Sequence, residues 1–260
     1  MHSIKLFALA PCPGLCLAAL SHGAVVYEHG FSGSSGDSLN GVKPDVAPNS
    51  TVAWTSNTGI RADGSVTTGN TSAWLPYSFG SGVYEVKLTL QFVSTSGTGY
   101  GAISFTTADP FDTGALSTVN VAAYATFGIR ANRDFEFWGG AGSANNIDGG
   151  ALPAAVSGNG TLRLVLNTTS SAWTVDAFFT PNDSDTELTI DLNPLDAGST
   201  THTFGANQPA SSFTGVGIIQ GTVNVKFDQF TFTVVPEPSS MALIALGAAP
   251  LALRRRRQSI

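Results

Sequence analysis

The stretch VYEVKLTLQFV, residues 83–93, alternates apolar and polar side chains along most of its length. The apolar set is Tyr84, Val86, Leu88, Leu90 and Phe92, and the polar set is Glu85, Lys87, Thr89 and Gln91. Successive side chains of a β-strand point to opposite faces, so a period of two puts one set on each face. The stretch therefore predicts a half-buried strand whose apolar face lies in a core.

Ten further segments are rich in apolar, β-branched or aromatic residues, and Gly, Asn, Asp and Pro separate them. They are residues 25–27, 51–55, 102–106, 124–130, 134–138, 162–167, 173–179, 188–192, 216–220 and 223–234. No stretch between residues 25 and 235 shows a sustained helical period. The chain is therefore predicted to be all-β, as a single antiparallel β-sandwich.

Two kinds of local signal refine this strand pattern. The dipeptides Asp63-Gly64 and Asp148-Gly149 are typical of tight turns. In the last strand, the gap from Phe227 to Phe230 breaks the alternation of apolar residues. One extra residue in one strand of a pair is the definition of a β-bulge, so a bulge is predicted near Asp228-Gln229.

The composition excludes several classes of protein. Only 12% of the 260 residues are charged, about half the share typical of globular proteins. That fraction is too low for a coiled coil or a charge-rich disordered chain. The formal net charge of −6 also argues against a basic nucleic-acid-binding protein.

The first 24 residues have the layout of a secretory signal. Lys5 supplies a positive charge, residues 6–20 are mostly apolar, and Ser21-His22-Gly23-Ala24 offers small residues for cleavage. Residues 1–24 are therefore predicted to be a signal peptide that is cut after Gly23 or Ala24.

The C-terminus combines three features in a fixed order. Pro236-Glu237-Pro238 is followed by the apolar run 241–253 and then by Arg254, Arg255, Arg256 and Arg257. As a helix the apolar run spans about 20 Å, against about 30 Å for a bilayer's hydrocarbon core. A short transmembrane helix of this kind suits a temporary anchor, and the arginines are expected to stay cytoplasmic.

This order resembles the PEP-CTERM sorting signal of Gram-negative bacteria. The resemblance implies that residues 236–260 hold the exported protein in the inner membrane until exosortase, a membrane protease, removes the tail near Pro-Glu-Pro. It also implies a final location at the cell surface or in the extracellular matrix, in a family associated with exopolysaccharide.

The predicted domain between the two targeting segments, residues 25–235, differs sharply from its ends. It contains seven Lys or Arg and 17 Asp or Glu, so its net charge is about −10. It contains no cysteine, because Cys12 and Cys16 both lie in the signal. Its stability must therefore come from packing and hydrogen bonds, with no disulfide and no thiol chemistry.

Three short motifs connect this domain to a known fold. They are Phe31 with Leu39-Asn40-Gly41, Gly82-Val83-Tyr84-Glu85-Val86, and Phe227-Asp228-Gln229-Phe230-Thr231-Phe232. They resemble the concanavalin A-like (LamG-like) jelly-roll sandwiches found in many PEP-CTERM proteins. The resemblance implies that the first and last strands lie close together, which would put the sorting tail beside the N-terminus.

The best pair of acids in the domain is Asp134 and Glu136, in Asp134-Phe135-Glu136-Phe137-Trp138. A strand period puts both acids and Trp138 on one face. Glycoside hydrolysis needs two carboxylates facing the scissile bond. The pattern of concanavalin A-like glycosidases is not matched, since no third acid follows. A solvent-facing strand with Arg130 or Arg133 as ion-pair partners is the alternative interpretation.

Aromatic residues are the candidates for carbohydrate binding, because their rings stack on sugar faces. Trp54 and Trp173 alternate with apolar neighbours and are predicted to lie in the core. Trp74 and Trp138 stand beside loop-forming residues and are the surface candidates. His202 lies in a polar run and is predicted to be a solvated loop residue.

A metal site is conceivable at one acidic turn only. Asp183, Asp185 and Glu187 place oxygens at alternating positions, which Ca²⁺ accepts. The turn lacks the glycine and the spaced glutamate of an EF-hand, and an ordinary acidic hairpin is the alternative. No cofactor is otherwise implied.

Three functional hypotheses follow. The preferred one is an exported, non-catalytic surface or matrix protein with weak polysaccharide binding. The second is a glycoside hydrolase or lyase on the same fold that uses Asp134 and Glu136. The third is a purely structural surface protein without a ligand.

Overall fold

The computed structural model describes residues 23–57, 59–67, 69, 71–94, 99–107, 124–140, 146–192, 199–204, 213–221 and 225–236. These residues form fourteen strands and no helix. The strands are β1 (Ala24–His29), β2 (Thr55–Ser56), β3 (Thr71–Pro76), β4 (Val83–Phe92), β5 (Tyr100–Thr107), β6 (Tyr124–Arg130), β7 (Asp134–Gly140), β8 (Asn146–Ala151), β9 (Gly160–Asn167), β10 (Thr174–Pro181), β11 (Leu188–Ile190), β12 (His202–Thr203), β13 (Phe213–Gly221) and β14 (Val225–Val235).

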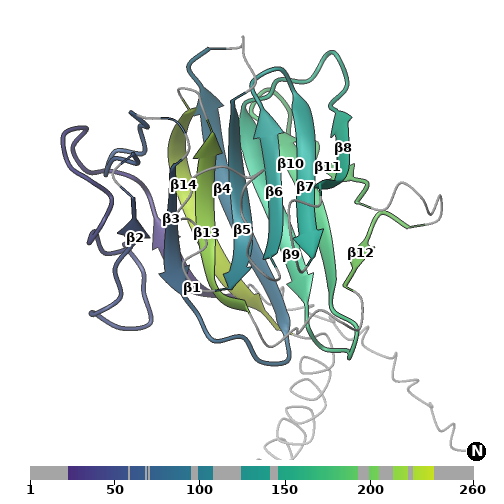
Figure 1. Ribbon diagram of the computed structural model, residues 1–260, viewed down its shortest axis with the longest axis horizontal. Helices are drawn as coiled ribbons and strands as arrows, with labels where there is room; N and C mark the ends of the chain where they lie inside the picture. The colour runs from purple at the N-terminus through teal and green to yellow at the C-terminus, as the bar shows by residue number, and fades with distance from the viewer. Residues whose placement is uncertain are drawn as a thin grey trace, which may run out of the picture.

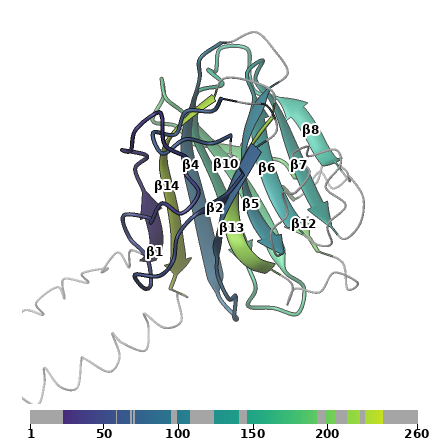
Figure 2. The same cartoon turned by 60° about the vertical axis from the view of Figure 1, so that its left-hand side comes forward.

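The strands make two seven-stranded antiparallel sheets, which stack face to face (Figures 1 and 2). The first sheet has the order β1-β14-β4-β9-β10-β11, with β12 beside β10. The second sheet has the order β2-β3-β13-β5-β6-β7-β8. The predicted all-β antiparallel sandwich is thereby confirmed.

The core lies between the sheets and follows from period-two alternation. In β4, Val86, Leu88 and Leu90 are fully buried, while Glu85 and Lys87 lie on the outer face. Ile103 and Phe105 of β5 are also fully buried and belong to the same apolar cluster. Burying a large apolar side chain contributes about 1.5–3 kcal/mol, so these rows hold the sheets together.

The predicted bulge is present in β14. Its pairing with β4 shifts register between Phe227 and Gln229, so that Phe227 and Phe230 are both fully buried. The extra residue restores the inward direction of the apolar side chains after the gap in the alternation.

Two local predictions were wrong, and β3 was not predicted. The Asp148-Gly149 dipeptide lies within β8 and forms no turn, because Gly149 pairs with Glu136 of β7. Residues 51–54 form no strand, since Trp54 instead exchanges backbone hydrogen bonds with the segment 41–42. β3, around Trp74, was missed and is paired with β13 over its full length.

The first and last strands lie side by side, as the resemblance implied (Figure 2). Ala24 of β1 pairs with Val234 of β14, two residues before Pro236. Gly23 and Pro236, the described residues next to the two predicted targeting segments, therefore lie at one end of the sandwich. No helix in the described part is long and apolar enough to cross a membrane, and residues 1–22 of the predicted signal peptide and the apolar run 241–253 lie outside it.

Candidate functional site

The outer face of the second sheet carries the predicted acid pair. Phe137 of β7 is fully buried and Phe135 packs against the core, which leaves Asp134 and Glu136 on the opposite face. Trp138 is on that face too, because it packs in a separate cluster with Tyr100, Ala102 and Ile219. The face predicted from the strand period is correct for all three residues.

Glu136 is held by an arginine. Nε of Arg130 donates to Oε1 of Glu136 at 2.8 Å, and its Nη2 donates to the same oxygen. The guanidinium also lies 5.8 Å from the ring centre of Tyr100. The alternative interpretation of the acid pair, a strand whose acids form ion pairs with Arg130 or Arg133, thus describes Glu136 and Arg130.

The second acid has a separate local partner. Nδ2 of Asn132 donates to Asp134 at 2.7 Å. Arg133 does not join either acid, because it donates to the carbonyl of Ala154. The two carboxylates thus share a face, while each is engaged by its own neighbour.

One row of residues runs straight across this sheet between the two candidate tryptophans. Trp74 pairs with Gly217, Gly217 with Ser104, Ser104 with Thr126, and Thr126 with Trp138. The hydroxyl oxygens of Ser104 and Thr126 are 2.7 Å apart, so the middle of the row is a hydrogen-bonded pair. With strands about 4.8 Å apart, roughly 19 Å separates the Cα atoms of the tryptophans.

Glycines lie beneath the aromatic rings of this face. A Cβ on Gly215 would come 2.7 Å from Cε3 of Trp74, and one on Gly221 would come 2.1 Å from Cε1 of Tyr100. Any larger residue at these positions would push the rings off the sheet. The sequence uses glycine here for close approach, in strands that otherwise favour branched residues.

The burial of the tryptophans corrects part of the sequence prediction. Trp138 is only 5% exposed, so it is not a surface residue, and Trp74 is half-buried. Trp54 is 1% exposed and lies in the core as predicted, while Trp173 is half-buried and stacks on Phe213 at 5.8 Å. Of the two surface candidates, only Trp74 keeps appreciable exposure.

A pocket of about 580 Å³ lies at the end of β3, where Pro76 is one of its lining residues. Its polar groups come from Asn49, Ser78 and Thr214, and its other walls are Tyr27, Pro48, Val52, Pro76, Tyr77, Phe79 and Phe213. Several of these residues are exposed, so the pocket is open to solvent. We call it the Tyr77 pocket.

The walls of the Tyr77 pocket are fixed by hydrogen bonds and ring contacts. Tyr27 donates its hydroxyl to the carbonyl of Pro76, and the amide of Tyr77 donates to the carbonyl of Thr214 at 2.8 Å. The ring of Tyr77 meets that of Phe79 edge-on at 4.9 Å. Burial, with a smaller effect of neighbouring tyrosines, raises the pKa of both Tyr27 and Tyr77, so both hydroxyls are donors at neutral pH.

Sequence reasoning did not find this pocket. Its lining comes from four separate segments, and only the tertiary fold brings them together. The one available signal was Pro76-Tyr77-Ser78-Phe79, a loop that combines aromatic rings with a hydroxyl.

The acidic turn is not assembled for a metal ion. Asp183 and Asp185 are exposed, and Glu187 binds Arg163 through Nε at 2.7 Å and through Nη2. Within the described ranges, no three His, Cys, Asp or Glu side chains come together as a possible metal site. The structure therefore engages Glu187 with Arg163 and does not bring it together with Asp183 and Asp185 as a set of three ligands.

Both histidines of the domain are packed against aromatic rings. His29 is 4% exposed and meets Phe31 edge-on at 4.7 Å. His202 was predicted to be a solvated loop residue, but it lies in β12 and is half-buried at 5.3 Å from the ring of Phe137. Burial lowers the pKa of both, and for His29 the nearby Asp45 opposes the shift.

Comparison with known proteins identifies the C-terminus. Residues 234–257 match the family model of the PEP-CTERM protein-sorting motif. The chain ends in a PEP-CTERM motif. β14 continues to Val235, immediately before the Pro-Glu-Pro of the motif. Pro236 is half-buried, and the other residues of the sorting signal, Glu237, Pro238 and Arg254 to Arg257, lie outside the described residues.

Three solved structures illustrate what the sandwich is similar to. A Bacillus subtilis protein of unknown function with a galectin-like fold is 14% identical, with 83% of this chain and 98% of that chain covered and a TM-score of 0.46. Lectin II from Ulex europaeus is 9% identical, with 73% and 94% covered and a TM-score of 0.45. Arcelin-5 from Phaseolus vulgaris is 10% identical, with 73% and 95% covered and a TM-score of 0.46.

No curated protein matches the chain. With structural similarity at this level, the assignment of the fold rests on the strand pairings themselves.

Proposed function

We propose that this PEP-CTERM protein is an exported surface or matrix protein, processed by an exosortase-type membrane protease, whose sandwich binds polysaccharide without cleaving it. The sorting motif supports export and processing of the tail. In a Gram-negative bacterium this route leads from transient anchoring in the inner membrane to the cell surface or the extracellular matrix.

The Tyr77 pocket is the observation that carries the binding function. A sugar ring has an apolar face of C–H groups and an edge of hydroxyls. The pocket offers aromatic and proline surfaces for the first, and Ser78, Asn49 and the hydroxyl of Tyr77 for the second. Open pockets lined by apolar groups with a few polar ones are the usual form of small-molecule sites.

Trp74 extends this site along the sheet. It lies two residues before Pro76 on the same strand and the same face, about 7 Å away between Cα atoms. A chain of sugars that leaves the pocket over Pro76 meets the half-buried ring of Trp74 next. Trp138, at the other end of the row, is the second sequence candidate and lies too deep to provide a comparable surface.

The engagement of the acids favours binding over hydrolysis. Arg130 donates twice to one oxygen of Glu136, and Asn132 holds Asp134. A glycosidase needs one free nucleophile or base and one proton donor across a cleft. The Tyr77 pocket itself contains no carboxylate among its lining residues.

The test compares two serines of one loop. Ser78 lines the pocket, whereas Ser81 is exposed in the same loop and does not. Ser78→Trp fills the pocket and is expected to abolish retention of the protein on immobilised polysaccharides, while Ser81→Trp leaves retention intact. Neutral glucan is expected to retain the protein better than alginate, because the domain carries a net charge of about −10.

Each outcome of that experiment selects one hypothesis. Retention lost only in Ser78→Trp supports the Tyr77 pocket. Released oligosaccharide that disappears in Glu136→Gln would establish the hydrolase or lyase instead. A lack of both retention and turnover across the panel would leave a purely structural surface protein.

A further inference from the structure

We propose that one end of the sandwich faces the membrane surface while the sorting tail is still attached. This end carries the loop 77–82, which connects β3 to β4, and the loop 168–173, which connects β9 to β10, and we call it the tail end. The inference rests on the proposed sorting function and adds an orientation and a lipid-facing surface to it.

Strand register defines the tail end. Val235, the last residue of β14, pairs with Val83 of β4, and Val83 pairs with Asn167 of β9. Asn167 pairs in turn with Thr174, the first residue of β10. The point where the chain leaves for the membrane is therefore level with the two loops 77–82 and 168–173.

The N-terminal segment leaves from the same end. Ala24 pairs with Val234, so the predicted signal peptide and the sorting tail emerge next to each other. The signal peptide is predicted to be cut after Gly23 or Ala24, so the sorting tail is the connection that remains in the inner membrane. The new N-terminus lies at the same end of the sandwich as that connection.

The connection to the anchor is short. Five residues, Pro236–Ser240, separate the last paired residue from the apolar run that begins at Met241. Fully extended, five residues span at most about 18 Å. Two of the five are prolines, which restrict the backbone further. The tail end is therefore held close to the bilayer and cannot turn away freely.

Charge favours the same orientation. A domain with a net charge of about −10 is repelled by anionic lipids. The loops 77–82 and 168–173, however, contain no charged residue. The acidic turn 182–187 lies at the opposite end of β10, eight residues or about 27 Å away. With a Debye length of about 8 Å at physiological salt, that turn is screened from the membrane in this orientation.

The tail end is also a firm and mildly amphipathic surface. The hydroxyl of Thr168 donates to the carbonyl of Gly80 at 2.7 Å and accepts from the amide of Gly82 at 2.9 Å, so the two loops are tied together. Tyr77, Phe79 and Trp173 are half-buried, next to exposed serines and the exposed Gly80. Aromatic residues in such positions are favoured at the boundary between lipid and water.

The experiment measures the distance of each end from lipid. The full chain with Cys12→Ser and Cys16→Ser is given a single fluorescent label at Ser171→Cys or at Ser184→Cys. Both serines are exposed, the first in a tail-end loop and the second in the acidic turn. The protein is reconstituted into vesicles of phosphatidylethanolamine and phosphatidylglycerol that contain headgroup spin-labelled lipid as a quencher.

The label at Ser171 is expected to be strongly quenched and the label at Ser184 to keep its fluorescence. Equal quenching at the two positions, or stronger quenching at Ser184, would overturn the proposed orientation. In protein from which the predicted signal peptide has been cut, Leu246→Asp, which interrupts the apolar run, should abolish both vesicle binding and quenching. If the unaltered chain does not bind vesicles at all, the anchoring step of the sorting function fails, and the orientation fails with it.

A second comparison tests the role of charge. Ser171→Glu is expected to weaken partition into the anionic vesicles by about fivefold, the equivalent of ~1 kcal/mol for one charge close to the surface. Ser184→Glu should leave partition unchanged. The effect at Ser171 should shrink as salt is raised, and an equal effect of the two substitutions would contradict the inference.

Discussion

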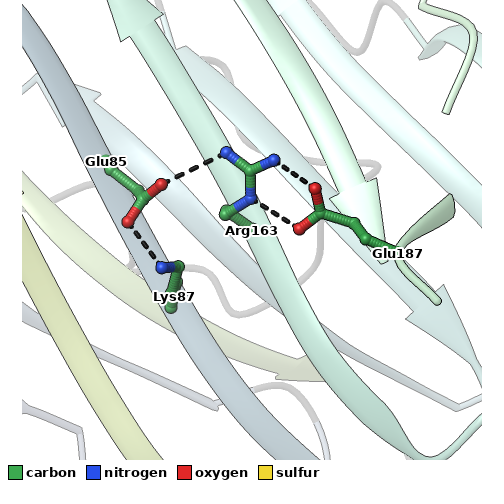
Figure 3. Close-up of polar contacts among 4 residues, drawn as sticks. All are labelled: Glu85, Lys87, Arg163 and Glu187. Atoms are coloured by element: carbon green, nitrogen blue, oxygen red, sulfur yellow. Dashed lines mark hydrogen bonds and ion pairs between the residues drawn. The ribbon is translucent and has the colours of Figure 1, made fainter. Parts of the chain in front are cut away.

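Replacing Arg163 should destabilise the sandwich more than any other single change on the outer face of the first sheet. Arg163 of β9 lies between two glutamates (Figure 3). Its Nη1 is 3.2 Å from Oε2 of Glu85, and its Nε is 2.7 Å from Oε2 of Glu187. The guanidinium also lies 3.7 Å from the ring centre of Phe178, and Lys87 binds the other oxygen of Glu85 at 2.7 Å.

The expected loss in the free energy of unfolding follows from the exposure of these side chains and from their contacts. The side chains of Arg163 and Glu85 are 19% and 17% exposed, so their ion pair is more strongly coupled than a surface pair. Hydrogen bonds to charged groups contribute about 1.5–3 kcal/mol. Glu187 is 38% exposed, so its ion pair with Arg163 adds at most about 1 kcal/mol. The contact of the guanidinium with the ring of Phe178 adds a similar amount. Arg163→Ala is therefore expected to cost about 3 kcal/mol.

Two controls separate charge from shape. Lys87 is 44% exposed and its ion-pair partner among the described residues is Glu85, so Lys87→Ala should cost less than about 1 kcal/mol. Arg163→Lys keeps the charge but loses the planar fork that binds two carboxylates, and should fall between the two. Burial opposes the charge of Arg163, but Glu187 and Glu85 hold its pKa above the usual value, so it stays charged at every working pH.

The assay is urea unfolding monitored by tryptophan fluorescence, with the free energy of unfolding extrapolated to zero urea. The reasoning would be refuted if Arg163→Ala cost less than about 1 kcal/mol, which is the surface value, or if Lys87→Ala cost as much.

Three further outcomes are expected. Burial lowers the pKa of His29 and His202, so as the pH falls below about 6.5 the unfolded chain takes up protons before the folded one. The free energy of unfolding should therefore fall between pH 7 and pH 5, by at most about 1.4 kcal/mol per pH unit for each histidine. Thermal unfolding across that range checks this, and replacing both histidines by glutamine should flatten the curve. Gly221→Ala should cost about 1–3 kcal/mol in urea unfolding, because its Cβ would lie 2.1 Å from the ring of Tyr100; an unchanged midpoint would contradict this packing. Calcium should leave the Tm unchanged relative to EDTA, since a glutamate of the turn 182–187 is bound to arginine, and a rise in Tm would show that the turn rearranges.

The inner strands could be predicted because their alternation is dictated by burial on one face. The stretch 83–92 is β4, with every predicted inward residue buried. The bulge at Asp228 was predictable for the same reason, since a gap in the apolar period must be absorbed somewhere in the ladder.

The strands that were missed have little local preference for a strand. β8 contains Asp148, Gly149 and Gly150, residues that favour turns, and it is a strand because β7 offers an edge with which to pair. β3 begins with polar residues and ends in Pro76, and β13 supplies its partner in the same way. Tertiary pairing overrides local preference in both cases.

The same limit applies to the candidate site. The strand period correctly placed Asp134, Glu136 and Trp138 on one face, yet it carried no information on depth, and Trp138 is 5% exposed. The Tyr77 pocket could not be predicted, because it depends on Tyr27 and Phe213 meeting a loop from another part of the chain. The period of a strand predicts which face a side chain lies on, whereas its burial and any cavity beside it depend on segments that are distant in the sequence.

The pairing of β1 with β14 has a mechanical consequence for the removal of the tail. Ladder pairing extends to Ala24 on one strand and to Val235 on the other, and Pro236 has no amide hydrogen with which to extend it. A protease that cuts within Pro-Glu-Pro therefore breaks no strand pairing, whereas a cut before Val234 would remove a β14 partner from both β1 and β4. Strand pairing thus includes the chain up to Val235 and ends immediately before the motif.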